Sequence, residues 1–241
     1  MPDGTLAGAF AHRGLWRADG PPENSMAAFR AAAEAGVGIE LDVQLSEDGV
    51  PVVFHDPMLE RMTDALGPIW SQPLETLSGL TLAGSSETIP TLGAVAQALP
   101  RGLPVLVELK ASPGDPLDYL RAVDLALFGA PIDAAVMSFT DSLNIAAQTL
   151  MPHRQRGLLV APSETDAPAA HHKAHQKAKA LGCRFLAVRH EDVDRFAAPE
   201  GVADPLPIHV WTVDTDAALH AVRGKAAGII FEHIDPALVT G

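Results

Sequence analysis

Short apolar runs alternate with alanine-rich stretches of helical periodicity along this chain of 241 residues. The apolar runs predict strands at residues 9–13, 38–44, 51–55, 104–109, 134–139, 156–160, 185–189, 207–213 and 228–231. The stretches between them predict helices at residues 24–35, 91–99, 116–127, 141–150, 167–181 and 215–222. Repeated alternation of this kind indicates an α/β fold with a parallel sheet. Because the chain has the usual length of a (β/α)8 TIM-type barrel, we expect that fold, with a doubly wound sheet as the alternative.

Two segments depart from this rhythm. The runs at 38–44 and 51–55 are joined by a turn sequence at 46–49 rather than by a helix, so we expect them to supply one barrel strand between them. Residues 57–90 contain four prolines and little periodicity, and they are too long for an ordinary connection. We therefore predict a single barrel domain over residues 1–241, with 57–90 as a small insertion over one of its ends.

The charge and cysteine content exclude several classes of protein. With 17 Lys and Arg against 30 Asp and Glu, the formal net charge of −13 argues against a nucleic-acid partner, which needs a basic surface. The single cysteine, Cys183, excludes a disulfide framework and a Cys-rich zinc site. No apolar run is long enough to span a membrane, and the first residues do not resemble a signal peptide. We expect a cytoplasmic protein that does not insert stably into membranes.

Charged residues interrupt two strands that should be buried. Side chains alternate between the two faces of a strand, so Glu40 and Asp42 share one face, and so do Glu108 and Lys110. Unpaired carboxylates are too costly to bury, so three of them together suggest a divalent cation. Ligands that are all oxygen suit Mg²⁺ or Ca²⁺ better than Zn²⁺. Structural salt bridges, Glu40 with Arg13 and Glu108 with Lys110, are the alternative.

Two histidines make a reaction centre the stronger interpretation. His12 and His55 each end a predicted strand, and the carboxyl ends of barrel strands are where this fold carries out chemistry. Imidazole can give or take a proton near neutral pH. Arg13 and Lys110 add positive charge that suits an anionic substrate. Together with the carboxylates, these residues favour metal-assisted phosphoryl transfer with a pair of proton shuttles.

The same residues resemble motifs of the glycerophosphodiester phosphodiesterases, in the order that this family has them. The resemblance covers most of the chain and is most specific in its N-terminal half. The matching motifs are His12-Arg13-Gly14, Pro22-Glu23-Asn24, Glu40-Leu41-Asp42-Val43, Asp48-Gly49, His55-Asp56, Leu59, Arg61, Thr63-Asp64, Ile89-Pro90-Thr91-Leu92, Glu108-Leu109-Lys110, Ser138-Phe139 and Trp211-Thr212-Val213.

The resemblance implies a catalytic barrel that hydrolyses deacylated phospholipids, such as glycerophosphocholine, to glycerol 3-phosphate and an alcohol. It implies a divalent metal ion as cofactor, a small-molecule substrate and an insertion at 57–90 near the mouth of the site. Its motifs imply roles for nine residues, with Glu23 and Asn24 close by. These are metal ligands at Glu40, Asp42 and Glu108, acid and base at His12 and His55, phosphate binding at Arg13 and Lys110, and apolar lining at Phe139 and Trp211.

The end of the last predicted strand departs from the family pattern. The family usually shows Thr-Asp and then Pro there, whereas this chain has Phe231-Glu232-His233-Ile234-Asp235-Pro236. The departure removes none of the residues assigned above.

Other residues invite a functional interpretation but favour a structural one. His171 and His175 have the i, i+4 spacing of zinc ligands, yet no Glu lies between them, so we expect a solvated basic helix face. We expect His209 in the core and Cys183 as a small buried apolar residue. Walker A and Gly-x-Ser-x-Gly motifs are absent, which argues against nucleotide binding and serine hydrolysis.

Three functions remain open from the sequence. The first is a glycerophosphodiester phosphodiesterase. The second is a lysophospholipase D, or a lyase that stops at a cyclic phosphate, on the same scaffold. The third is a non-catalytic phosphodiester-binding protein, which the presence of both His12 and His55 disfavours.

Overall fold

The computed structural model describes residues 6–165, 169–197 and 201–241. Its strands form a closed barrel. β1 pairs with both β2 and β9, and every neighbouring pair around the barrel is parallel, which confirms the predicted (β/α)8 fold. The barrel strands of the described residues are β1 (Gly8–His12), β2 (Gly38–Leu45), β4 (Pro104–Leu109), β5 (Asp133–Ser138), β6 (Gln155–Leu159), β7 (Phe185–Arg189), β8 (Ile208–Val213) and β9 (Gly228–Phe231).

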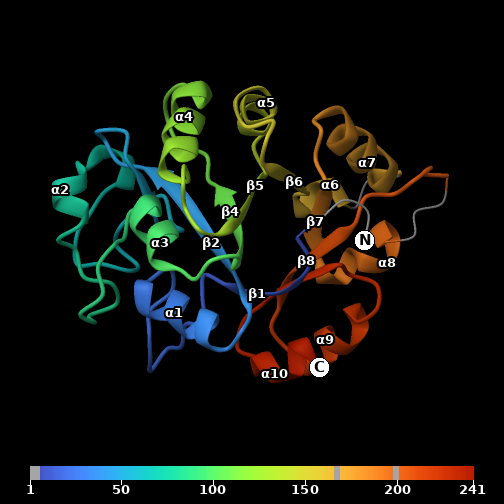
Figure 1. Cartoon of the computed structure of the whole chain (residues 1–241), viewed down its shortest axis with the longest axis horizontal. Helices are drawn as coiled ribbons and strands as arrows, with labels where there is room; N and C mark the ends of the chain where they lie inside the picture. The colour runs from blue at the N-terminus through green and yellow to red at the C-terminus, as the bar shows by residue number, and fades with distance from the viewer. Residues whose placement is uncertain (1–5, 166–168, 198–200) are drawn as a thin grey trace.

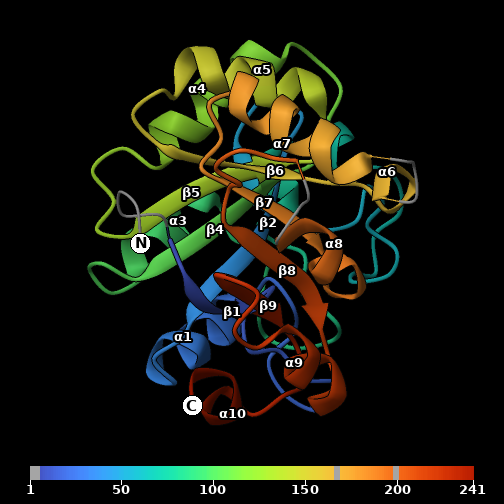
Figure 2. The same ribbon diagram turned by 90° about the vertical axis from the view of Figure 1, so that its right-hand side faces the viewer.

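Helices cover the outside of the barrel (Figure 1). Figure 2 shows α4, α5 and α7 together on one side of the strands, with α9 and α10 on the opposite side. Apolar side chains of these helices and of the outward strand faces form the main hydrophobic core. The helices are α1 (Met26–Glu34), α2 (Leu74–Leu77), α3 (Leu92–Ala98), α4 (Pro116–Ala126), α5 (Asp141–Leu150), α6 (Pro162–Thr165), α7 (Ala170–Ala180), α8 (Val193–Ala197), α9 (Asp216–Val222) and α10 (Pro236–Thr240), with 3-10 turns η2 (Ile69–Ser71) and η3 (His190–Asp192).

The six helices expected from periodicity are present as α1, α3, α4, α5, α7 and α9, within two or three residues of the predicted ends. Residues 167 and 168 of the helix expected at 167–181 lie outside the described residues. Several helices begin at a side-chain cap, which satisfies an amide that has no partner within the helix. Ser25 accepts from the Ala28 amide and Thr91 from the Ala94 amide. Of the missed helices, α8 has five residues, which is too short to show a period.

One of the nine predicted strands, at 51–55, is a hairpin partner of β2 and not a barrel strand. β3 (Pro51–Val53) runs antiparallel to the end of β2, with Val43 opposite Val53. The turn between them is closed by the Ser46 amide, which donates to the Val50 carbonyl, and by Gly49 with a positive φ of 77°. The expectation that 38–44 and 51–55 supply one barrel strand between them is therefore confirmed.

The insertion at 57–90 contains short elements around a small hydrophobic cluster of its own. Leu59, Ile69, Leu77 and Leu82 pack there with Val52 of β3 and with other apolar side chains. In Figure 1 the insertion, with α2, lies outside the ring of helices and beside the end of β2. Because β2 ends at the carboxyl side of the barrel, the insertion stands near the mouth of the pocket described below.

Aromatic rings fill the interior of the barrel. His209 stacks on Phe185, with ring centroids 4.2 Å apart, and more loosely on Phe10 at 5.7 Å. Glycines leave room for these rings, because a Cβ on Gly157 would lie 2.1 Å from the Phe185 ring and one on Gly228 would lie 2.6 Å from the His209 ring. His209 is fully buried, as expected for a core residue.

One histidine expectation is wrong. His175 does not lie on a solvated helix face, because it is fully buried between α7 and the segments around Phe196 and Leu206. Its Nε2 donates to the Phe196 carbonyl at 3.2 Å, and its Nδ1 accepts from the Leu206 amide at 3.2 Å. Both ring nitrogens are thus used to hold the structure. Cys183 is buried, as expected.

The described part of the chain contains no helix long and apolar enough to cross a membrane. The cytoplasmic location stays a prediction.

Candidate active site

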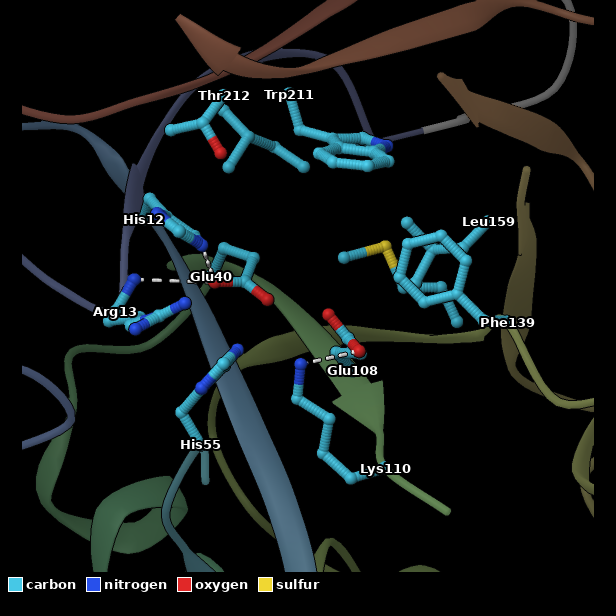
Figure 3. Close-up of a pocket in the computed structure, with 12 residues that line it drawn as sticks. His12, Arg13, Glu40, His55, Glu108, Lys110, Phe139, Leu159, Trp211 and Thr212 are labelled. Atoms are coloured by element: carbon cyan, nitrogen blue, oxygen red, sulfur yellow. Dashed lines mark hydrogen bonds and ion pairs between the residues drawn. The ribbon is translucent and has the colours of Figure 1, made fainter. Parts of the chain in front are cut away.

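A pocket opens at the carboxyl ends of the barrel strands (Figure 3). Parallel strands bring their carboxyl ends to one side of the barrel, so residues from distant parts of the chain meet there. Of the nine residues that the sequence singled out, eight line the pocket, and the ninth, Asp42, is buried beside it. The lining residues are His12, Arg13, Glu40, His55, Glu108, Lys110, Met137, Phe139, Leu159, Trp211, Thr212 and Ile230.

Three carboxylates converge at the base of the pocket. Glu40 and Asp42 come from β2 and Glu108 from the adjacent strand β4, and one oxygen of each lies within 4.8 Å of the others. All three side chains are buried. Burial, and then the charge of Asp42, raise the pKa of Glu40 to about 8, and the same two causes raise the pKa of Glu108. The positive groups of the protein therefore do not fully neutralise the negative charge of these three carboxylates.

A divalent cation fits this donor set. The cluster offers only oxygen ligands, which Mg²⁺ and Ca²⁺ prefer, and it is the one group of three or more possible ligands among the described residues. Two of its members have a raised pKa, so added positive charge would favour their ionised forms. These observations fit a metal ion without identifying it.

Two cations also reach the carboxylates. Lys110 Nζ lies 2.6 Å from Glu108 and 2.9 Å from Asp42, and these carboxylates keep its pKa raised in spite of burial. Arg13 pairs with Glu23 at 2.9 Å and with Asp42 at 3.5 Å. Glu40 instead accepts from the backbone amide of Arg13 at 3.2 Å. Of the two salt bridges considered above, Glu108 with Lys110 is present, whereas the Arg13 guanidinium pairs with other acids.

The loop after β1 holds Arg13 in place by a tight turn. Arg13 and Gly14 both have positive φ angles, 57° and 82°, and this region favours glycine. A Cβ on Gly14 would lie 2.8 Å from Ala28 of α1, so only glycine allows the loop to lie this close to the helix.

His12 is held on both sides. Its Nδ1 lies 2.8 Å from Oε2 of Glu232, and its Nε2 lies 4.0 Å from Oε2 of Glu40. Burial would lower the pKa of His12, but the hydrogen bond with Glu232 and the charge of Glu40 outweigh it and raise the pKa. Burial would likewise raise the pKa of Glu232, but the bond from His12 lowers it, so Glu232 is the charged acceptor.

His55 has a carboxylate partner of its own. Its Nδ1 lies 2.6 Å from Oδ1 of Asp56, and burial lowers the pKa of His55. Asp56 is in turn bound by Arg61, which also contacts Glu23 at 2.6 and 2.9 Å. Arg61 belongs to the insertion, so 57–90 supplies the cation that anchors Asp56.

The wall opposite the histidines is apolar. Phe139 and Trp211 meet edge to face, with ring centroids 5.5 Å apart, and Met137, Leu159 and Ile230 complete the surface. Figure 3 shows Phe139 and Leu159 across the pocket from His12, Arg13 and His55. The site therefore has one charged side and one apolar side.

Three residues of the site, Glu232, Asp56 and Arg61, have no role that follows from the sequence alone. Asp56 and Arg61 belong to the quoted motifs, but only the fold shows that they hold His55. Glu232 lies 220 positions from its partner His12, and its one signal was the departure from the family pattern at the end of β9. A parallel pairing of β1 with β9 in the observed register would have placed Glu232 beside His12.

Known proteins resemble this chain in sequence and in fold. The model of the glycerophosphoryl diester phosphodiesterase family matches residues 12–236. Glycerophosphodiester phosphodiesterase 1 of Bos taurus is 36% identical over 125 residues, which are 48% of this chain and 37% of the bovine protein. The chain thus matches little more than a third of that relative's length. A glycerophosphodiester phosphodiesterase of Caldanaerobacter subterraneus is 34% identical over 62% of this chain and 65% of its own length.

Solved structures share the whole fold. A phosphodiesterase of Oleispira antarctica, in complex with the product sn-glycerol-3-phosphate, has a TM-score of 0.81 at 26% identity, covering 97% of this chain and 95% of that one. A glycerophosphodiester phosphodiesterase of Thermotoga maritima, with a TM-score of 0.74 at 23% identity over 94% of each chain, supports the fold alone. Since the family match extends from His12 at the end of β1 to Pro236 at the start of α10, this protein belongs to the glycerophosphoryl diester phosphodiesterase family.

Proposed function

We propose that this protein hydrolyses glycerophosphodiesters, such as glycerophosphocholine, to glycerol 3-phosphate and an alcohol in a reaction that depends on a divalent metal ion. The observation that carries the proposal is one pocket in which a buried triad of carboxylates faces two histidines, each bonded to a carboxylate through Nδ1. The phosphodiesterase of Oleispira antarctica, whose structure contains sn-glycerol-3-phosphate, supports this choice of product.

Glu40, Asp42 and Glu108 would hold the metal ion, Mg²⁺ or Ca²⁺, through their oxygens. When bound, the ion would supply positive charge that offsets the negative oxygens of the phosphate as the reaction proceeds. Lys110 and Arg13, on the same side of the pocket, would bind the remaining phosphate charge. Phe139 and Trp211 would line the site against the carbons of the substrate.

His12 and His55 would act as a pair of proton carriers. One takes the proton of the glycerol hydroxyl adjacent to the phosphate, whose oxygen then attacks phosphorus. The bond from phosphorus to the alcohol oxygen breaks, and the other histidine protonates the leaving alcohol. The resulting cyclic phosphate is opened by water, with the roles of the two histidines exchanged. An internal nucleophile is already in position, which avoids the entropic cost of capturing a water molecule.

A lysophospholipase D or a lyase that stops at the cyclic phosphate would use the same residues. The ring of Phe139 on the apolar wall is partly exposed, and such a surface would suit the acyl chain of a lysophospholipid. Product analysis separates these activities, since the lyase releases a cyclic phosphate and the lysophospholipase D produces a lysophosphatidic acid.

The test of the proposal is to incubate the purified protein with glycerophosphocholine and to measure glycerol 3-phosphate and choline. We expect equal amounts of both from the wild type. The His12→Ala protein, purified in the same way, controls for a contaminating phosphodiesterase. Equal rates in the two preparations, or no products from the wild type, would refute the proposed activity.

A further inference from the structure

We propose that Glu232 is a positioning residue for His12: its carboxylate accepts the Nδ1 proton and thereby keeps the Nε2 atom directed at the carboxylate triad. The inference rests on the proposed function, because it assigns a task to a partner of a proposed acid or base. It is independent of which substrate the enzyme prefers.

Closure of the barrel brings the two residues together. β1 and β9 pair in parallel with Ala11 beside Phe231, so His12 and Glu232 are the next neighbours as both strands end. The Glu232 amide donates to the carbonyl of Val213 on β8 at 3.1 Å, which fixes the backbone that carries the carboxylate. The acceptor is therefore held by two strands, and the imidazole by a third.

The chemistry of the pair fixes the tautomer of His12. An ionised carboxylate only accepts hydrogen bonds, so at 2.8 Å from Glu232 the Nδ1 atom must be the donor. In the neutral ring the free electron pair is then on Nε2, which lies 4.0 Å from Glu40 on the pocket side. Without the carboxylate, the ring can carry its proton on Nε2, and the nitrogen on the pocket side is then a donor that cannot accept a proton.

The two histidine pairs differ in what else binds the carboxylate. Asp56, the partner of His55, is also bound by Arg61 through both of its oxygens. Glu232 pairs with His12 and, at the longer distance of 4.0 Å, with His233. A second residue therefore keeps Asp56 in place, whereas the orientation of Glu232 depends mainly on His12 itself. Loss of the Glu232 carboxylate should thus affect His12 with little disturbance elsewhere.

Kinetics of two variants test the inference first. Glu232→Gln keeps the shape but removes the charge, and Glu232→Leu removes the acceptor. We expect kcat on glycerophosphocholine to fall by about 10- to 100-fold, the size of effect that follows the loss of a residue that orients a metal-binding histidine, with KM and Mg²⁺ affinity changed by less than about threefold. Glu191→Gln is the matched control, because Glu191 also lies beside a histidine, His190 at 3.5 Å, but outside the pocket. Its kcat should equal that of the wild type.

A second measurement needs no substrate. ¹⁵N NMR of the histidine rings, at a pH where they are neutral and with excess Mg²⁺, reports which nitrogen carries the proton. We expect His12 to carry it on Nδ1 in the wild type and to shift toward Nε2 in Glu232→Leu, while His209 is unchanged in both. This outcome holds even if glycerophosphocholine proves to be the wrong substrate.

The inference is overturned if His12 has the same tautomer in the wild type and in Glu232→Leu. It is also overturned if an active enzyme loses less than about twofold in kcat in both variants. Thermal unfolding is measured alongside. If Glu232→Leu does not fold, the same two criteria are applied to Glu232→Ala, which also removes the acceptor from this partly exposed position.

Discussion

Asp42 on β2 and Glu108 on β4 are register partners in adjacent parallel strands, and both side chains are buried. Two carboxylates placed opposite each other in this way repel, and Glu40, two residues before Asp42 on the same strand face, adds a third charge. Among the ion pairs of the described residues, Lys110 contacts Asp42 and Glu108 but not Glu40. The pKa of Glu40 rises to about 8 through burial and the charge of Asp42. This arrangement is the physical reason to expect a metal ion.

His12→Ala and His55→Ala should each reduce kcat by on the order of 10² to 10⁴, the usual contribution of a general acid or base. Neither residue belongs to the carboxylate triad, so Mg²⁺ affinity, measured by calorimetry, should change little. Near-normal turnover in either variant would mean that this histidine is structural.

Lys110→Ala should raise KM and lower kcat together. The ammonium group lies in the pocket beside two carboxylates, where it can stabilise the phosphate as charge develops during the reaction. Steady-state kinetics with glycerophosphocholine separate the two constants. A higher KM with unchanged kcat would restrict Lys110 to substrate binding.

The cyclic route requires a substrate with a hydroxyl group adjacent to the phosphate. The 2-deoxy analogue of glycerophosphocholine lacks the internal nucleophile, so it should bind with similar affinity but release choline orders of magnitude more slowly. Competition assays give its affinity, and choline release gives its turnover. Comparable turnover of the two compounds would rule out the cyclic phosphate and leave direct attack by water.

His209 should make the fold sensitive to acid. Burial lowers the pKa of His209 to about 4, and the Leu6 carbonyl at 2.9 Å is its one hydrogen-bond partner among the described residues. The folded state binds this proton less readily than the unfolded state, whose histidine titrates near 6.5. The neutral side chain therefore stabilises the fold fully above pH 6.5, and this stability is lost as the pH falls toward 4.

Between pH 7 and pH 5 the loss from His209 should be about 2 kcal/mol. Urea unfolding at the two pH values measures it in the wild type and in His209→Phe, which keeps an aromatic ring but cannot titrate. The variant should lose about 2 kcal/mol less than the wild type over this range. An equal loss in both proteins would show that other groups cause the acid sensitivity.

The sequence predicted those parts of the fold and site that depend on local periodicity. Alternation along 38–44 predicted that Glu40 and Asp42 share a face, and the structure places both beside Glu108. The contact of His12 with Glu232 could not be predicted in this way, because it arises only when β1 and β9 close the barrel. Arg61 lies in a segment without periodicity, so the sequence pattern gave no direction for its side chain. The burial of His175 depends on segments around Phe196 and Leu206 that its own helix does not specify.

The most direct test of the central claim is the dependence of glycerophosphocholine hydrolysis on a divalent metal ion. Glycerol 3-phosphate release is measured for the wild type and for Glu40→Gln after treatment with a chelator, and again as Mg²⁺ or Ca²⁺ is added back. We predict that the chelator lowers turnover by more than about 100-fold, since loss of even an indirect partner of a metal site costs about 10- to 100-fold. Added metal should restore the wild type, whereas Glu40→Gln should need a higher concentration and recover less. Full turnover by the chelator-treated wild type would contradict the account and leave Glu40, Asp42 and Glu108 as ion-pair and hydrogen-bond partners of Arg13 and Lys110.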